Sequence, residues 1–173
     1  MPENETVKIP STKSVEYKQP SGNRYIKRGG TLAWRNNNPG NIKDSDFVRR
    51  KGALGNNKGF AVFPDYETGR QAMKDLFETN SYENINVKKA LQRYAPKNEN
   101  DTEKYIDFVE NSSGLDRDQS LSELSKSQKE KLLDSIEEFE GNSPGEIIPI
   151  PQSKPSENQN IQEFDATGRR IRN

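Results

Sequence analysis

The sequence predicts an α+β domain that is mostly α-helical, with a small β region at its N-terminal side. Up to about residue 63, short runs of aromatic and aliphatic residues alternate with Gly- and Asn-rich turns, which is typical of short strands. Beyond that point, apolar residues recur at helical spacing and follow residues that commonly cap helices. About four helices are therefore expected after the β region. Separate groups of strands and helices are characteristic of α+β domains.

The β region is expected to contain four short strands. Residues 25–27 and 31–34 flank Gly29 and Gly30, a pattern that favours a hairpin. Residues 47–48 and 59–63 indicate two further strands, separated by a Gly- and Asn-rich loop.

The helices are predicted from their caps and apolar stripes. Asp65 follows Pro64 and can cap a helix, and Asn86 can cap the next one, which Pro96 ends. Asn100 with Glu103 has the spacing of a capping box, as have the pairs Ser120 with Glu123 and Ser125 with Gln128. The apolar residues that these helices would bury are Ala72, Met73, Leu76, Phe77, Val87, Ala90, Leu91, Tyr94, Tyr105, Ile106, Phe108, Val109, Leu132, Leu133, Ile136 and Phe139.

Composition divides the chain into a folded centre and two tails. Hydrophobic residues make up only 28% of the 173 residues, and the deficit is concentrated at the two ends. We expect residues 1–22 to be a disordered N-terminal tail and residues 143–173 a disordered Pro-, Gln- and Asn-rich C-terminal tail, because neither can bury much apolar surface. The folded domain would then span residues 23–142.

Absent residue types exclude several classes of enzyme. The chain has no Cys and no His, so it cannot use a thiol nucleophile, a Ser-His-Asp triad or a Cys- or His-ligated zinc site. We expect no cofactor and no metal. The formal net charge is zero, which predicts no binding of nucleic acid. Acid–base chemistry near neutral pH would fall to carboxyl groups with shifted pKa values, as in glycosidases.

Residues 34–42 form the most unusual segment of the chain. Three consecutive Asn residues precede Pro-Gly-Asn, and residue types that favour turns are concentrated there. Carboxamides beside an indole suit a ligand rich in hydroxyl and acetamido groups, whereas a multiply bonded structural turn is the alternative. The substrate-binding candidates in this segment are Trp34, Asn36, Asn37, Asn38 and Asn41.

Four blocks of the sequence resemble a lysozyme-like group of phage virion proteins and cell-wall-degrading effectors of injection systems. Residues 35–42 resemble its Arg-Asn-Asn-Asn-Pro-Gly-Asn-Ile signature. Residues 59–72, 93–105 and 137–141 follow in the order that the group shows. A fainter likeness exists to peptidoglycan glucosaminidases.

The resemblance implies a lysozyme-like domain that cleaves the glycan strands of peptidoglycan. The reaction would be that of a muramidase, a glucosaminidase or a lytic transglycosylase. In the glucosaminidases the catalytic Glu precedes the Asn turn, and here only Glu3, Glu5 and Glu16 do. This departure favours the alternative, a non-catalytic lysozyme-like module that binds wall or packs within a virion or injection apparatus.

The predicted catalytic residues are Glu99, as general acid, and Asp101, which would stabilise positive charge or position water. Glu99 precedes the helix cap, which does not require it. The stretch Glu-Asn-Asp-Thr that begins at Glu99 is also a signature of the lysozyme-like group. Tyr94 and Tyr105 are candidates for stacking on sugar rings, with burial in the core as the alternative. Weaker catalytic candidates are Glu67, Asp65, Asp44 and Asp46.

The expected partners are peptidoglycan and, in addition, an inhibitor (immunity) protein or a component of a delivery apparatus. No apolar run is long enough for a signal peptide or a membrane span. We therefore expect synthesis in the cytoplasm and delivery to the periplasm or cell wall by an injection system or a phage particle.

Overall fold

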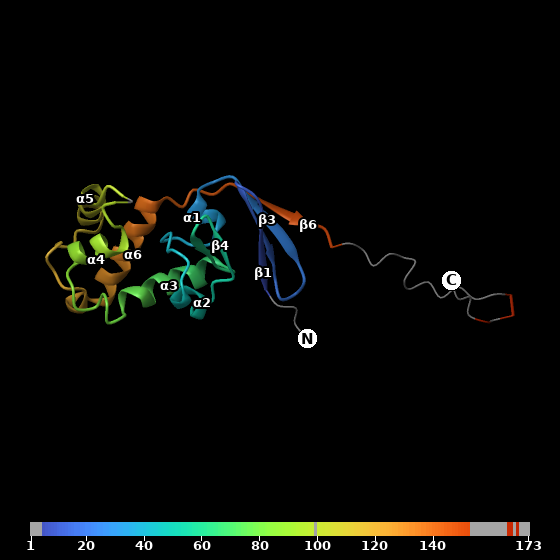
Figure 1. The fold of residues 1–173 in the computed structure, drawn as a ribbon, viewed down its shortest axis with the longest axis horizontal. Coiled ribbons are helices and arrows are strands. Elements are labelled where there is room, and N and C mark those ends of the chain that lie inside the picture. The colour runs from blue at the N-terminus through green and yellow to red at the C-terminus, as the bar shows by residue number, and fades with distance from the viewer. Residues whose placement is uncertain (1–4, 99, 153–165, 168, 170–173) are drawn as a thin grey trace.

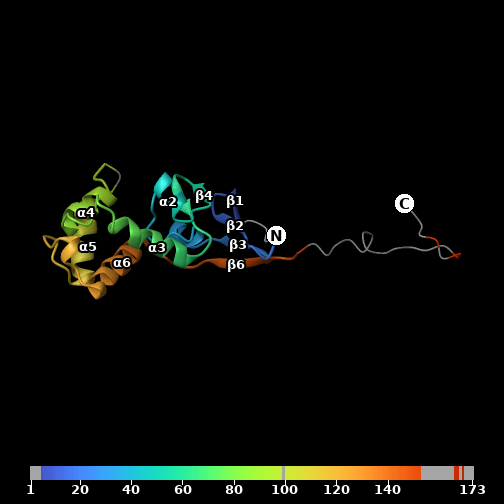
Figure 2. The same cartoon turned by 90° about the horizontal axis from the view of Figure 1, so that it is seen from below.

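The computed structural model describes residues 5–98, 100–152, 166, 167 and 169. A four-stranded sheet lies at one end of the fold, and helices α4, α5 and α6 lie at the other (Figure 1). Helix α3 and a small two-stranded sheet lie between them, as a perpendicular view also shows (Figure 2).

The larger sheet is antiparallel, in the order β1-β2-β3-β6. Its strands are β1 (Thr6–Ser11), β2 (Ser14–Lys18), β3 (Arg24–Arg28) and β6 (Glu146–Ile150). Val15 and Tyr17 on β2 are 0% and 2% exposed and pack with Val62 in a small core of their own. Val15 and Tyr17 alternate with the partly exposed Glu16 and Lys18, as expected for a strand with one more deeply covered face.

Three of these strands lie in segments that we expected to be tails. Two of them belong to residues 1–22, and β6 belongs to residues 143–173. Strand β6 pairs with β3, opposing Ile148 to Ile26. Each segment is poor in apolar residues overall, but its backbone groups are satisfied by neighbouring strands. Strand β1 pairs with β2, and β2 pairs with β3, the next strand along the chain, whereas β6 pairs with a strand more than a hundred residues earlier. The tail prediction for residues 1–4 and 153–165 lies outside the described residues.

The middle of the molecule contains α1 (Leu32–Arg35), α2 (Asp46–Arg50) and the two-stranded sheet of β4 (Gly55–Asn57) and β5 (Phe60–Val62). We expected strands where α1 and α2 lie, and that prediction is wrong. The hydroxyls of Thr31 and Ser45 each accept a hydrogen bond from the third residue of the helix that follows. These N-caps favour a helical turn over a strand.

The longer helices are α3 (Tyr66–Phe77), α4 (Val87–Tyr94), α5 (Thr102–Ser113) and α6 (Lys126–Glu140), with a 3₁₀ turn, η1 (Leu121–Glu123), before α6. The predicted caps Asp65 and Asn86 are confirmed, as is the capping box of Ser125 and Gln128. The cap predicted at Asn100 is one residue too early, because Asp101 accepts the hydrogen bond from Lys104 N.

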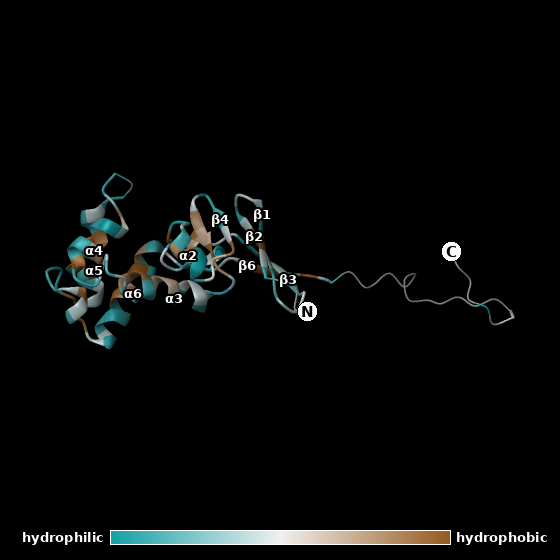
Figure 3. Cartoon of the chain, turned by 60° about the horizontal axis from the view of Figure 1, so that its bottom comes forward, coloured by the Kyte–Doolittle hydropathy of each residue, from teal (hydrophilic) through white to brown (hydrophobic). Residues whose placement is uncertain are grey.

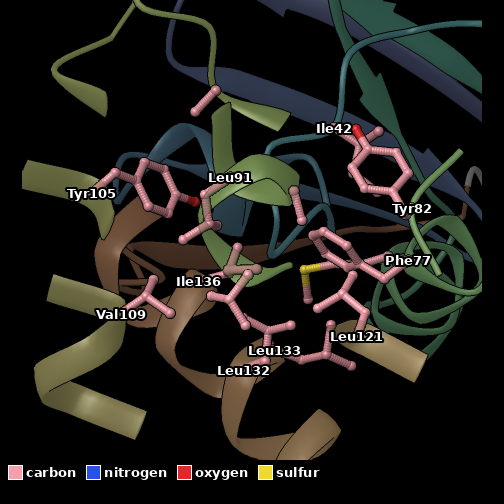
Figure 4. Close-up of a cluster of buried hydrophobic side chains, with 14 of the residues drawn as sticks. Ile42, Phe77, Tyr82, Leu91, Tyr105, Val109, Leu121, Leu132, Leu133 and Ile136 are labelled. Atoms are coloured by element: carbon pink, nitrogen blue, oxygen red, sulfur yellow. The ribbon is translucent and has the colours of Figure 1, made fainter. Parts of the chain in front are cut away.

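The main core consists largely of side chains from α3 to α6, and hydrophilic and hydrophobic residues alternate along these helices (Figure 3). Phe77, Leu91, Val109 and Ile136 come from four successive helices and converge there (Figure 4). Ile42 belongs to this core and comes from residues 34–42, called the Asn-rich turn below. The turn is thereby fixed against the helical part of the molecule.

The fold class is a mixed α+β fold with a substantial sheet, and our prediction of a mostly α, lysozyme-like domain is wrong. The described residues form six α-helices, a four-stranded sheet and a two-stranded sheet. About four helices and a small N-terminal β region were expected. The difference arises from the extra sheet strands and from the two short capped helices α1 and α2.

Candidate active site

A cavity of about 460 Å³ lies where the Asn-rich turn meets the helical part of the molecule. One wall comes from the turn, the segment after it and β5, and the other from α3, α4 and the end of α6. Its lining residues are Asn41, Ile42, Lys43, Ser45, Phe60, Leu76, Tyr82, Tyr94, Ala95, Asn100 and Glu140. The mixture of aromatic, aliphatic and polar groups is typical of a small-molecule site, and the volume is within the usual range.

Glu140 is the only carboxylate among the described residues that line this cavity. It is the last residue of α6, and Gly141 ends the helix with a positive φ of 80°. The hydroxyl of Tyr105 donates to Glu140 Oε1 at 2.8 Å, and Asn41 Nδ2 donates to Oε2 at 3.1 Å. The carboxyl group is therefore held from the helical side and from the turn.

Burial raises the pKa of the Glu140 carboxyl group, while the hydrogen bonds from Asn41 and Tyr105 oppose that rise. The net shift is upward, because the half-buried site disfavours the charged form more than two donors favour it. A carboxyl group that keeps its proton closer to neutral pH is suited to act as a general acid.

The three consecutive Asn residues of the turn, Asn36, Asn37 and Asn38, are buried, and their side chains form hydrogen bonds within the protein. Asn38 donates to the carbonyl oxygens of Ile42 and Ala61, and its own Oδ1 accepts from Ile42 N. Asn37 Nδ2 donates to Phe63 O at 3.2 Å, and Asn36 Oδ1 accepts from Asn57 Nδ2 at 2.9 Å. These contacts join the turn to β4 and β5. None of the three Asn residues lines the Glu140 cavity, so their role in substrate binding remains a prediction.

Asn41, in contrast, lines the cavity. Its backbone has a φ of 47°, in the left-handed region that Asn tolerates better than most residues. Its Oδ1 is buried and has no hydrogen-bond partner among the described residues. Rotation of the amide by half a turn would exchange Nδ2 and Oδ1 beside Glu140. The amide can therefore donate to the carboxylate or accept from the protonated carboxyl group.

The aromatic candidates occupy three different positions. Tyr94 lines the cavity, and its hydroxyl donates to Gly40 O. Tyr105 is fully buried and contacts Glu140 from within the core. Trp34 lines a different pocket, together with Lys27. Of these three predicted sugar-binding residues, the structure places Tyr94 in the wall of the Glu140 cavity.

The catalytic candidates from the sequence are dispersed. Glu99 lies outside the described residues. Asp101 is the exposed N-cap of α5 and lines a separate pocket of about 430 Å³, which shares Asn100 with the Glu140 cavity. Hydrogen bonds from Arg49 and Asn56 lower the pKa of Asp44 to about 2, so that this carboxylate is ionised and unsuited to donate a proton.

The remaining carboxylate candidates have positions at helix N-termini. Asp46 is in the first turn of α2, Asp65 is the N-cap of α3, and Glu67 is in the first turn of α3. Carboxylates are stabilised at such positions by the helix dipole. None of the three lines the Glu140 cavity.

Sequence reasoning missed Glu140, although it lies in the last of the four blocks that carry the resemblance. It was overlooked because it ends a helix and is followed by Gly-Asn, where a carboxylate is easily taken for a solvated surface residue. One available signal was its position near the negative end of the α6 dipole, where an acidic residue is disfavoured without a specific reason.

In comparisons with known proteins, no family model matches the chain. The chain is similar to Protein P5 of Pseudoalteromonas phage PM2, with 36% identity over 95 residues. The match covers 51% of this chain and 59% of the phage protein, so the chain spans less than two thirds of its relative. This match shows that the chain has a relative in a bacteriophage.

No helix among the described residues is long and apolar enough to cross a membrane.

Proposed function

We propose that the protein cleaves the glycan strands of peptidoglycan, with Glu140 as the general acid in the cavity beside the Asn-rich turn. The observation that carries this proposal is the geometry of Glu140, a half-buried carboxyl group with a raised pKa in a cavity of about 460 Å³. Two side chains hold it in one orientation. An ionisable group in a pocket whose pKa is shifted by burial is a candidate for a catalytic group.

In the proposed reaction, protonated Glu140 donates its proton to the oxygen of the glycosidic bond. The bond to the leaving sugar breaks as that oxygen accepts the proton, and positive charge develops at the anomeric carbon. The resulting carboxylate then accepts the proton of the attacking hydroxyl group. Attack by water completes hydrolysis, whereas attack by the C6 hydroxyl of the same sugar gives a 1,6-anhydro product, as in a lytic transglycosylase.

Cavity residues supply groups that suit a sugar substrate. Phe60, Tyr82 and Tyr94 provide aromatic surface, and Asn41, Ser45 and Asn100 provide polar groups for hydroxyl and acetamido substituents. The resemblance of residues 35–42 to the signature of cell-wall-degrading proteins supports peptidoglycan as the polymer. The phage relative supports delivery to the wall in a virion, although its name states no activity.

The second candidate is a wall-binding or structural module without catalysis. The observation in its favour is that the described lining of the cavity contains one carboxylate, whereas most glycosidases use two. Such a module would bind glycan in the same cavity and leave it intact. An inhibitor protein or a component of a delivery apparatus would be a further partner in either case.

Incubation of the purified protein with peptidoglycan sacculi, followed by mass spectrometry of the soluble products, distinguishes these functions. Our proposal predicts disaccharide-peptide fragments. A reducing end that gains water indicates hydrolysis, and a product lighter by one water indicates the 1,6-anhydro sugar. Sacculi that bind the protein but release no fragment would favour the non-catalytic module. Release of free peptides with intact glycan strands would refute glycan cleavage.

A further inference from the structure

A second pocket lies apart from Glu140 and is bordered by a buried cation. It has a volume of about 270 Å³ and is lined by Lys27, Ala33, Trp34, Asn37, Tyr66 and Asn142. Lys27 comes from β3 and Trp34 from α1, while Tyr66 begins α3. None of these lining residues belongs to the Glu140 cavity.

The Lys27 ammonium is held in place by neutral groups. Its Nζ donates to Asn37 Oδ1 at 2.6 Å and to Trp34 O at 3.0 Å, and lies 4.6 Å from the centroid of the Trp34 ring. An ammonium group has three N–H donors, so one remains after these two hydrogen bonds. The residue is 9% exposed.

No carboxylate among the described residues forms an ion pair with Lys27. Burial alone lowers the pKa of its ammonium to about 8. A buried charge is costly without a compensating partner, because it has lost its hydration. Arg35 is also buried, and its guanidinium group donates to the carbonyl oxygens of Gly29 and Gly30. The region between β3 and α1 thus holds two buried cations without a described counter-ion.

We propose that the pocket of Lys27, Trp34 and Tyr66 binds the carboxylate of a small organic ligand. The carboxylate would pair with the Lys27 ammonium, and the apolar or sugar part of the ligand would lie against the rings of Trp34 and Tyr66. Cations and aromatic surface together are suited to an anionic group carried on a ring or a short chain. The inference goes beyond glycan cleavage and does not depend on Glu140.

The pocket volume limits the ligand to about one sugar ring or a short peptide end, because drug-sized ligands need about 300 Å³ or more. Two sources of such a carboxylate differ in chemistry. One is a lactyl ether on an amino sugar, as in N-acetylmuramic acid. The other is the free C-terminus of a peptide, for which acetyl-alanyl-alanine is a probe.

The fluorescence of Trp34 reports on this pocket directly, because it is the only Trp in the chain. We would titrate the full-length protein at constant ionic strength with N-acetylmuramic acid, N-acetylglucosamine and acetyl-alanyl-alanine. The two sugars differ only at the 3-oxygen, where N-acetylmuramic acid has a lactyl ether that carries the carboxylate and N-acetylglucosamine has a hydroxyl group. The proposal predicts a saturable change of emission with at least one carboxylate, and a much weaker effect of N-acetylglucosamine. The carboxylate that binds more tightly identifies the source.

Lys27→Met removes the charge and keeps most of the side-chain length, and Lys13→Met is the matched control at an exposed lysine. Loss of a charge-assisted hydrogen bond should raise the dissociation constant at least about tenfold in Lys27→Met and leave it unchanged in Lys13→Met. Circular dichroism establishes that both variants are folded. If Lys27→Met does not fold, the comparison of the two sugars in the wild type still decides.

Two results would overturn the proposal. If N-acetylglucosamine and N-acetylmuramic acid bind equally well, the pocket recognises a neutral sugar and the charge has no role in binding. If no carboxylate changes the emission, Lys27 has only a structural role, as hydrogen-bond donor to the carbonyl of Trp34 and the side chain of Asn37.

Discussion

Replacement of Glu140 by Gln should remove a half-buried titratable group while both of its hydrogen bonds are kept. In the wild type, the carboxyl group accepts from Tyr105 and Asn41. Gln keeps an acceptor for Tyr105, and its Nε2 can donate to Asn41 Oδ1, which has no partner now. The amide of Asn41 must rotate by half a turn for this exchange. Glu140→Ala, in contrast, loses both hydrogen bonds.

The magnitudes follow from the two contacts. A hydrogen bond contributes about 0.5–1.5 kcal/mol to stability, so Glu140→Ala should lower the free energy of unfolding by about 1–3 kcal/mol. Glu140→Gln should equal or exceed the wild type near pH 7, since the variant keeps two hydrogen bonds and buries no charge.

The pH dependence has a definite sign. The pKa of Glu140 is raised in the folded protein above its ordinary value of 4.5, so the folded state binds this proton more tightly than the unfolded state. The resulting stabilisation is complete below the unfolded pKa and is lost as the pH rises through the folded pKa. The wild type should therefore lose stability relative to Glu140→Gln as the pH increases above about 4.5.

Urea unfolding of the wild type, Glu140→Gln and Glu140→Ala between pH 4 and pH 8 measures both effects. Parallel stability profiles for the wild type and Glu140→Gln would show that burial does not shift this pKa. A Glu140→Gln protein as unstable as Glu140→Ala would refute the rotation of the Asn41 amide.

Further predictions concern the turn and the sheet. Asn38→Ala should lower the free energy of unfolding by about 1–3 kcal/mol because buried backbone groups lose their partners. Asn41→Gly, which removes the amide and adopts the positive φ of residue 41 without strain, should change stability less and reduce cleavage of peptidoglycan; urea unfolding and a digestion assay compare the two. A protein cut to residues 22–142 keeps the main core but should melt at a clearly lower temperature, since it lacks β1, β2 and β6 and with them the buried side chains of Tyr17 and of Val15, the latter worth about 1.5–3 kcal/mol. An unchanged transition in calorimetry would mean that the larger sheet contributes little to stability.

Local signals predicted the helices well. The caps Asp65 and Asn86 and the box of Ser125 and Gln128 act within a few residues, and the apolar stripes behind them repeat at a fixed spacing. For the same reason α1 and α2 were missed, because each is too short to show a stripe and is specified mainly by its cap.

The larger sheet and the site depend on contacts between distant parts of the chain. Strand β6 pairs with β3 across more than a hundred residues. The apolar residues of β6 and the strand pattern at residues 25–27 are visible in the sequence, but nothing local shows that these two segments pair. Glu140 meets Asn41 from a position 99 residues later in the sequence. Composition and spacing can identify a turn rich in carboxamides, but they cannot show which carboxyl group the fold brings to it.

The most direct test of glycan cleavage by Glu140 compares the rates at which four proteins solubilise purified sacculi. These are the wild type, Glu140→Gln, Glu99→Gln and the control Glu138→Gln, which changes an exposed carboxylate on the same helix. General acid catalysis contributes about 10²- to 10⁴-fold, so Glu140→Gln should lose at least 10²-fold in rate while Glu138→Gln stays near the wild type. A Glu140→Gln protein that digests sacculi at the wild-type rate, with Glu99→Gln inactive, would contradict the assignment and return the acid to Glu99.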